Sequence, residues 1–207
     1  MTDTYRTIAA PSEGSYSEQR SKFLAFALPV RTVEEVKQQV AAFSKKYYDA
    51  RHVCYAYLLG PEGKEYRAND NGEPSGTAGK PILGQLLSHS LTDTLVIVVR
   101  YFGGVKLGTS GLIVAYRTAT ADALAHAEII EKTVDGDLRI AFPYPLTNAV
   151  MRIVKEEGPR IAESGYADGL STLLLRTRLS LLPRLRKRLS ELHEVRFLDE
   201  EEKKTPT

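Results

Sequence analysis

Alternating and helically spaced apolar residues predict a strand, a helix and a second strand in the first third of the chain. Residues 20–30, RSKFLAFALPV, are apolar on both faces of an alternating pattern, so we expect a central strand there. Thr32 and Glu35 form a capping-box pattern ahead of an amphipathic helix. Residues 51–59, RHVCYAYLL, predict a second strand with one face through Val53 and another through Cys54.

The middle of the chain predicts a helix, a buried strand and a long alanine-rich helix. Pro81 suits the first turn of the first of these helices. Its expected buried stripe has four members: Ile82, Leu83, Leu86 and Leu87. The apolar run at residues 95–99 predicts a central strand. We expect the long helix over residues 112–127, with Thr109 or Ser110 as its N-cap.

The last third of the chain predicts alternating strands and helices in the order βαββαβ. The signals, in chain order, are a strand through Leu138, Ile140 and Phe142, a helix between Pro145 and Gly158, a hairpin across Asp168 and Gly169, a helix from Pro183, and a strand at 195–198. This order is that of the ferredoxin-like split βαβ motif.

The periodic pattern breaks around residues 128–136, where we place a domain boundary. The sequence therefore predicts an α+β protein with an N-terminal domain over 1–130 and a ferredoxin-like domain over 135–200. The charged segment 201–207, EEKKTPT, is expected to be a flexible tail.

Composition narrows the class of protein without identifying a function. The net charge of the 207 residues is +2 and the pI is about 8.5, which is too weak a bias to indicate nucleic-acid binding by itself. The single cysteine, Cys54, excludes an intramolecular disulfide. No run approaches 18 apolar residues, and we expect a soluble cytoplasmic protein without membrane contact.

Residues 69–81, NDNGEPSGTAGKP, form a glycine-rich loop ahead of a predicted helix. A Walker A loop needs glycine where Pro74 stands and Ser or Thr where Pro81 stands, so that pattern fails. An EF-hand loop with its turn at Gly72 would begin at Arg67 and end at Ala78, neither of which is acidic.

A second glycine-rich loop, residues 103–111, lacks the G-x-G-x-x-G dinucleotide pattern. Both loops precede helices, whose N-termini attract anions, and each carries a lysine, Lys80 or Lys106. Arg100 would add a bidentate donor. The alternative is that the glycines only permit tight turns and the lysines are solvated, and such turns are far commoner than anion sites.

Other candidate chemistry is weak. Tyr101 and Phe102 could form a stacking platform for a base, or one of them could be a core residue. Asp70 and Glu73 could be an acid/base or magnesium pair, but we prefer Asp70 as a turn cap and Glu73 as an ion-pair partner of Lys80 or Arg100. Cys54 is interpreted as a buried apolar residue.

We assign no catalytic residue, no metal site and no cofactor, because the four histidines are scattered and none has metal-ligand spacing to another or to Cys54. The basic residues of the last helix could form a face that contacts RNA, although exposed helix faces are usually charged. They are Arg184, Arg186, Lys187 and Arg188, with Arg176 and Arg178 on the preceding strand.

Two long motifs, DNGEPSGTAGKPIL and VVRYFGGVKLGTSGLIVAY, closely resemble the Impact/YigZ family in its two-domain bacterial form. The resemblance implies an N-terminal domain like the second domain of ribosomal protein S-five and a C-terminal domain like the last domain of elongation factor G. It also implies a link to translation control, and it implies no cofactor. The chain departs from the family pattern at Asn71, where an acid is common, and at Ser110, where glycine is common.

The motif positions define our candidate anion or nucleic-acid site. Its residues are Asp70, Gly72, Glu73, Gly76, Thr77, Gly79, Lys80, Arg100, Tyr101, Gly103, Gly104, Lys106, Gly108 and Thr109. The leading hypothesis is a non-catalytic, translation-associated regulatory protein that contacts RNA, the ribosome or a translation-control protein.

Two alternatives stay open. The first is an enzyme acting on a small phosphorylated or anionic substrate between the glycine loops, with Lys80 and Arg100 binding the anion and Asp70 or Glu73 as base. The second is a protein-interaction module.

Overall fold

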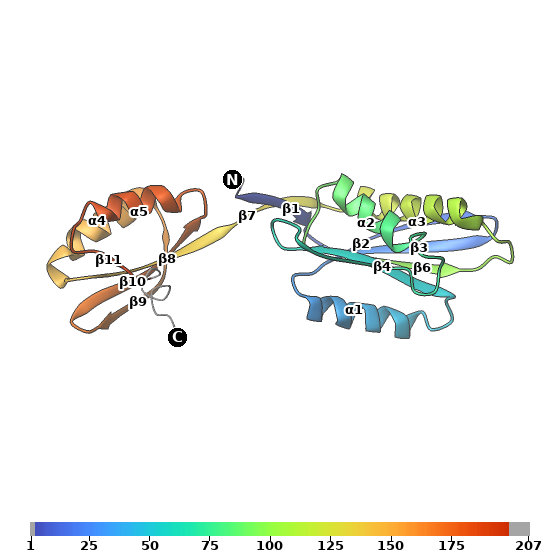
Figure 1. Ribbon diagram of the computed structural model, residues 1–207, viewed down its shortest axis with the longest axis horizontal. Coiled ribbons are helices and arrows are strands. Elements are labelled where there is room, and N and C mark those ends of the chain that lie inside the picture. The colour runs from blue at the N-terminus through green and yellow to red at the C-terminus, as the bar shows by residue number, and fades with distance from the viewer. Residues whose placement is uncertain (1–2, 199–207) are drawn as a thin grey trace. The chain divides into compact units, whose positions relative to one another are not determined.

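The computed structural model describes residues 3–198, which form two compact units (Figure 1). The N-terminal unit comprises Thr4–Lys132, and the C-terminal unit comprises the described residues from Thr133 onward together with Asp3. Mixed helices and several sheets confirm the predicted combination of α and β structure. No helix within 3–198 is long and apolar enough to cross a membrane.

The N-terminal unit is built on a five-stranded antiparallel sheet in the order β2-β3-β6-β4-β5. The strands are β2 (Ser12–Glu18), β3 (Ser21–Pro29), β4 (His52–Leu59), β5 (Glu65–Asn69) and β6 (Thr94–Tyr101). Two further strands, β1 (Thr4–Ile8) and β7 (Ile129–Thr133), pair with each other. The strands predicted from residues 20–30, 51–59 and 95–99 are confirmed as β3, β4 and β6, the three central strands.

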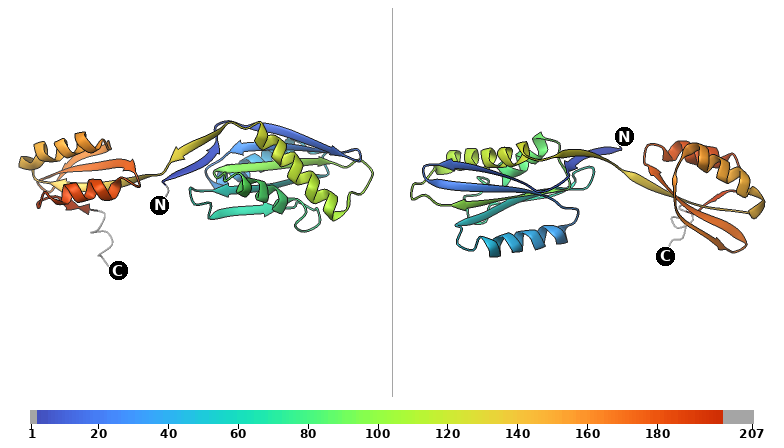
Figure 2. Two further views of the ribbon diagram at one scale, coloured as in Figure 1. Left: turned by 90° about the horizontal axis from the view of Figure 1, so that it is seen from above. Right: turned by 180° about the vertical axis from the view of Figure 1, so that it is seen from behind.

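Helices cover both faces of this sheet, which is why its central strands are apolar on both faces. Figure 1 shows α1 (Val33–Lys46) on one face, and α2 (Gly79–Ser88) and α3 (Gly108–Ala125) on the other. The same layering is visible from behind in Figure 2. As predicted, the Thr32 side chain caps α1, accepting a hydrogen bond from the Glu35 N–H.

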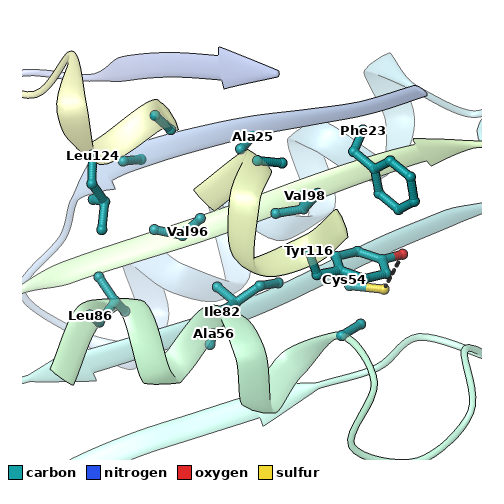
Figure 3. Close-up of a cluster of buried hydrophobic side chains, with 14 of the residues drawn as sticks. Phe23, Ala25, Cys54, Ala56, Ile82, Leu86, Val96, Val98, Tyr116 and Leu124 are labelled. Atoms are coloured by element: carbon teal, nitrogen blue, oxygen red, sulfur yellow. Dashed lines mark hydrogen bonds between the residues drawn. The ribbon is translucent and has the colours of Figure 1, made fainter. Parts of the chain in front are cut away.

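Two apolar cores result, one on each side of the sheet. Val53 and Tyr57 pack with α1, whereas Cys54, Ala56 and Leu58 face α2 and α3. The two faces predicted for residues 51–59 are therefore confirmed. Figure 3 shows the α2/α3 core, in which the side chains of Cys54 and Tyr116 meet.

The structure corrects three details of the predicted N-terminal unit. Leu87 is 55% exposed and does not belong to the buried stripe of α2. Helix α3 begins at Gly108, its N-cap is Leu107, and neither Thr109 nor Ser110 caps it. Strands β1, β2, β5 and β7 were not predicted, because their sequences are largely polar or short.

The C-terminal unit has the predicted βαββαβ order and a four-stranded antiparallel sheet, β11-β8-β10-β9. Its elements are β8 (Asp135–Phe142), α4 (Thr147–Glu157), β9 (Arg160–Ala167), β10 (Leu170–Arg178), α5 (Leu182–Ser190) and β11 (Arg196–Phe197), with a 3-10 turn at Tyr144–Leu146. Gly158 ends α4 in the left-handed conformation, as expected. The hairpin turns at Asp168 and Gly169, both with positive φ. The predicted tail 201–207 lies outside the described residues.

Gly14 provides a test of the packing between β2 and α3. A Cβ at Gly14 would lie 2.1 Å from the backbone nitrogen of Ala123, so no larger residue fits without moving the helix. We expect Gly14→Ala to lower the free energy of unfolding by about 1–3 kcal/mol, measured by urea denaturation.

Gly84→Ala in α2 is the matched control. A Cβ there meets nothing within 4 Å, and the better helix propensity of alanine should raise stability by up to about 1 kcal/mol. Equal effects of the two substitutions would contradict this account of the β2–α3 contact.

Candidate functional site

Strand register places Arg100 on the α2/α3 face, at one end of the sheet. Arg100 is paired with Phe23 on β3 and with His52 on β4, so all three side chains share a face. Tyr101, the next residue, points to the opposite face, where its hydroxyl donates to Asp49. The predicted grouping of Arg100 with Tyr101 is therefore wrong, because consecutive strand residues face opposite ways.

A buried ion pair joins the first glycine loop to β6. Nη1 of Arg100 donates to Oε1 of Glu73 at 2.6 Å, and both side chains are almost completely buried. The hydroxyl of Tyr116 on α3 donates to the same oxygen at 2.8 Å. The preferred interpretation of Glu73 as an ion-pair partner is confirmed, and that partner is Arg100.

Cys54 is buried next to Tyr116, the residue that donates to Glu73 of this ion pair, and its contacts indicate a structural role. Its Sγ is 2.9 Å from the carbonyl oxygen of Asp70 and 3.3 Å from the hydroxyl of Tyr116. Burial raises the pKa of the thiol to about 12, so the thiol stays protonated near neutral pH. The interpretation of Cys54 as a buried small residue is confirmed.

Asp70 holds the first glycine loop in shape. Its carboxylate accepts backbone hydrogen bonds from Gly76, Ala78 and Gly79 at 2.8–3.0 Å. Burial alone would raise the pKa of Asp70, but these three donors, with Lys80 nearby, hold it below its ordinary value of 3.8. Asp70 is thus the turn cap that the sequence predicted.

Two loop glycines permit the tight path of the chain around this carboxylate. Gly72 and Gly76 have φ values of +85° and +78°, in the region that glycine adopts most easily. Gly79 serves close approach instead, because a Cβ there would lie 2.5 Å from the backbone nitrogen of Asn69.

The two glycine loops line a common pocket of about 590 Å³ at this end of the sheet. Its walls are Arg51, His52, Glu73, Pro74, Arg100, Phe102, Lys106, Leu107, Gly108, Thr109 and Leu112. Three cationic side chains therefore face one carboxylate, and that carboxylate is already paired with Arg100. The pocket carries an excess of positive charge.

Arg100 has donors to spare. Within residues 3–198, Nε is buried without a hydrogen-bond partner, and only Nη1 is paired. The guanidinium carbon lies near two aromatic rings, 5.5 Å from the centroid of Phe23 and 5.6 Å from that of Phe102. Phe102 is 49% exposed and forms part of the pocket wall.

The N-terminus of α3 opens into the same pocket. Gly108 and Thr109 begin this 18-residue helix, and no side chain caps it. The first N–H groups of a helix lack partners within the helix and carry a partial positive charge. Together with Arg51, Arg100 and Lys106, they form an electropositive site suited to an oxyanion.

The structure separates the predicted site residues into three groups. Those that line the pocket are Glu73, Arg100, Lys106, Gly108 and Thr109. Those that shape the loops are Asp70, Gly72, Gly76, Thr77, Gly79, Gly103 and Gly104. Lys80 and Tyr101 lie elsewhere: Lys80 borders a second hollow, so the expectation that Lys80 and Arg100 hold one anion together is wrong.

The predicted site list did not include Arg51 or His52, and Phe102 was named only as one of a possible stacking pair with Tyr101. The β4–β6 register, which sets His52 opposite Arg100 and bonds the Arg51 N–H to the Arg100 carbonyl, was not readable from one strand alone. Nδ1 of His52 donates to the Asn71 carbonyl at 2.8 Å, and Nε2 lies 3.8 Å from Glu73. Both ring nitrogens thus face protein groups.

The basic residues of α5 are largely engaged with acids. Arg184 and Arg188 pair with Glu157, and Arg188 also contacts Glu156. Arg176 pairs with Asp137 on the neighbouring strand. The suggested RNA-binding face of the C-terminal unit is therefore partly neutralised by these acids. No group of three or more potential metal ligands occurs in the described part of the chain.

Comparisons with known proteins place this site in a family context. Residues 19–124 match the Impact N-terminal domain. The chain is 32% identical over 170 residues to IMPACT family member YvyE of Bacillus subtilis, covering 82% of this chain and 78% of that protein. It is 31% identical over 160 residues to IMPACT family member YigZ of Escherichia coli, covering 76% and 78%. A crystal structure of a hypothetical protein superimposes with a TM-score of 0.72 at 26% identity, covering 95% of this chain and 97% of that one.

Asp70 gives this site a testable pH dependence. Because its pKa is depressed in the folded protein, its contribution to stability is present above about pH 4 and is lost as the pH falls through the folded pKa. We expect Asp70→Asn to be less stable than the parent at pH 7, with the difference shrinking below about pH 4. Urea unfolding across this pH range measures it.

Glu13→Gln, which neutralises an exposed carboxylate on β2, is the control and should give a pH profile parallel to that of the parent. A difference between Asp70→Asn and the parent that stays constant down to pH 2 would refute the role of the Asp70 carboxylate.

Proposed function

The chain belongs to the Impact family, and we propose that it is a non-catalytic, translation-associated regulatory protein that binds RNA through the pocket of its N-terminal unit. The observation that carries the proposal is Arg100, a buried arginine with unpaired donors beside an uncapped helix N-terminus. Its positive charge comes from Arg100 on β6, Lys106 in the second glycine loop and Arg51 just before β4.

A phosphate group matches the donors of the pocket. Arginine binds phosphate oxygens through its planar fork, and Lys106 and Arg51 add exposed charge at the same opening. Backbone N–H groups at a helix start bind phosphate in many unrelated proteins. Glu73 accepts a hydrogen bond from only one nitrogen of Arg100, Nη1. This bond orients the guanidinium and leaves its other N–H groups available to a ligand.

Phe102 favours a nucleotide over a bare anion. Its exposed ring stands in the pocket wall next to the Arg100 guanidinium, where an unstacked base could lie against it. Base–aromatic stacking contributes about 1–3 kcal/mol per base in proteins that bind single strands. Of the predicted aromatic pair, Phe102 is thus the one proposed to stack.

The proposed link to translation includes a proposed likeness of the two units to domains of translation proteins. We propose that the N-terminal unit resembles the second domain of ribosomal protein S-five and that the C-terminal unit resembles the last domain of elongation factor G. The βαββαβ order of the C-terminal unit is consistent with the second likeness. Fold likeness alone does not define a function, so the pocket carries the argument.

The enzyme alternative is weaker, because the carboxylates it needs are engaged. Asp70 accepts three backbone hydrogen bonds, and Glu73 accepts from Arg100 and Tyr116. A general base must be free to reach the proton it removes. These contacts favour a binding site over a site for acid/base chemistry.

We expect the protein to bind an oligouridylate about 12 nucleotides long, with an affinity that falls steeply between about 50 and 200 mM salt. Lys106→Ala should weaken binding about tenfold, and should reduce the slope of log affinity against log salt by about 0.7, because one phosphate contact is lost. Fluorescence anisotropy of the labelled oligonucleotide measures both quantities.

Lys37→Ala, which removes an exposed lysine from α1 on the other face of the sheet, is the charge-matched control and should leave binding unchanged. Absence of binding at low salt, or an affinity that does not respond to salt, would exclude the proposed function.

A further inference from the structure

A second electropositive hollow is bordered by the first glycine loop, α2 and α3. It has a volume of about 360 Å³ and is bordered by Gly76, Lys80, Pro81, Gly84, Gln85, Ile113 and Arg117. We infer that Lys80 and Arg117 form a second phosphate subsite, and that the two subsites together bind two phosphates of one single-stranded RNA. This inference rests on the proposed function of the first pocket.

The first glycine loop and the first turns of α3 border both hollows. The first is lined by Glu73 and Pro74 of the glycine loop, and the second by Gly76, only two residues further along. On α3, Leu112 borders the first hollow, and its neighbour Ile113 borders the second. An RNA chain that passes from the first hollow to the second would cross the start of α3 and the glycine loop whose shape Asp70 holds.

Charge distinguishes the second hollow from an ordinary surface groove. Its lining contains two cations, both exposed, and no carboxylate. The nearest acid of the loop, Asp70, is occupied by three backbone donors. Neither Lys80 nor Arg117 forms an ion pair within residues 3–198, so both are available to a ligand.

Lys80 and Gly76 lie next to each other in the second hollow. It lies in the first turn of α2, and its side-chain stem runs along Gly76, where a Cβ would come within 3.4 Å of Cδ. Gly76 therefore leaves room for the lysine stem as well as adopting a positive φ. A residue larger than glycine at position 76 would crowd the Lys80 side chain, so the presence of Gly76 and that of Lys80 are linked.

Two positively charged subsites and the exposed ring of Phe102 together favour single-stranded RNA as the ligand. A mononucleotide would fill the first pocket and gain nothing from Lys80 or Arg117. A duplex keeps its bases stacked and paired, so it could not offer a base to Phe102. Single-stranded RNA can present a base to Phe102 and a second phosphate to the distant cations.

The test compares Lys80→Ala/Arg117→Ala with the parent in the full chain, using an oligouridylate about 12 nucleotides long and uridine monophosphate as probes. We expect the double substitution to weaken oligouridylate binding at least tenfold and to reduce the salt slope by about 1.4, which corresponds to two lost phosphate contacts. Binding of uridine monophosphate, followed by NMR titration, should not change.

The control is Lys37→Ala/Lys45→Ala, which removes two exposed lysines from α1 and should leave both probes unaffected. If Lys106→Ala weakens oligouridylate binding but Lys80→Ala/Arg117→Ala does not, the second subsite is excluded while the proposed function stands. Equal weakening of both probes by Lys80→Ala/Arg117→Ala would also overturn the inference, because the two cations would then belong to the first pocket.

Discussion

The buried ion pair between Glu73 and Arg100 is the interaction on which the site depends. It connects a loop with little apolar content to the central strand of the N-terminal sheet, and Tyr116 extends the connection to α3. Removing one partner of a buried pair leaves an uncompensated charge, at a cost of about 3–5 kcal/mol, whereas the intact pair contributes little net stability. We interpret the pair as a device that positions Arg100 and the loop rather than as a source of stability.

The rest of the pocket follows from ordinary rules of strand and helix geometry. Alternation along β6 sends Arg100 to the α3 face and Tyr101 to the α1 face. Antiparallel register then brings His52 opposite Arg100, with Arg51 beside it. The uncapped start of α3 and the exposed ring of Phe102 complete a site whose components come from four separate segments of the chain.

Much of the fold could be predicted because the central elements have strong local signals. Strands β3, β4 and β6 are apolar on both faces, α1 is preceded by a capping-box sequence, and Asp168–Gly169 is a strong signal for a two-residue hairpin turn. The edge strand β2, SEGSYSE, could not be recognised, because its solvent-facing residues are polar and Tyr16 is the only large apolar residue on its inward face. Its pairing with β3 is fixed by tertiary contacts such as that of Gly14 with α3.

The site was predictable only in part, because some of its residues are brought together by tertiary packing and not by local sequence. The motifs pointed to both glycine loops, and local chemistry was enough to identify Asp70 as a cap and Glu73 as an ion-pair partner. Which lysine accompanies Arg100 depends on the packing of α2 against α3, and so Lys106 and not Lys80 lines the first pocket. Placing Arg51 and His52 beside Arg100 required the strand register, which a single sequence does not contain.

The most direct test of the central claim, that Arg100 is the residue that binds the ligand, is the NMR signal of its Nε–H group. In the free protein this group is buried without a partner. Titration with an oligouridylate should shift the Arg100 Nε–H resonance saturably, with the same apparent affinity as anisotropy reports. Saturable RNA binding that leaves this resonance unmoved would contradict the account.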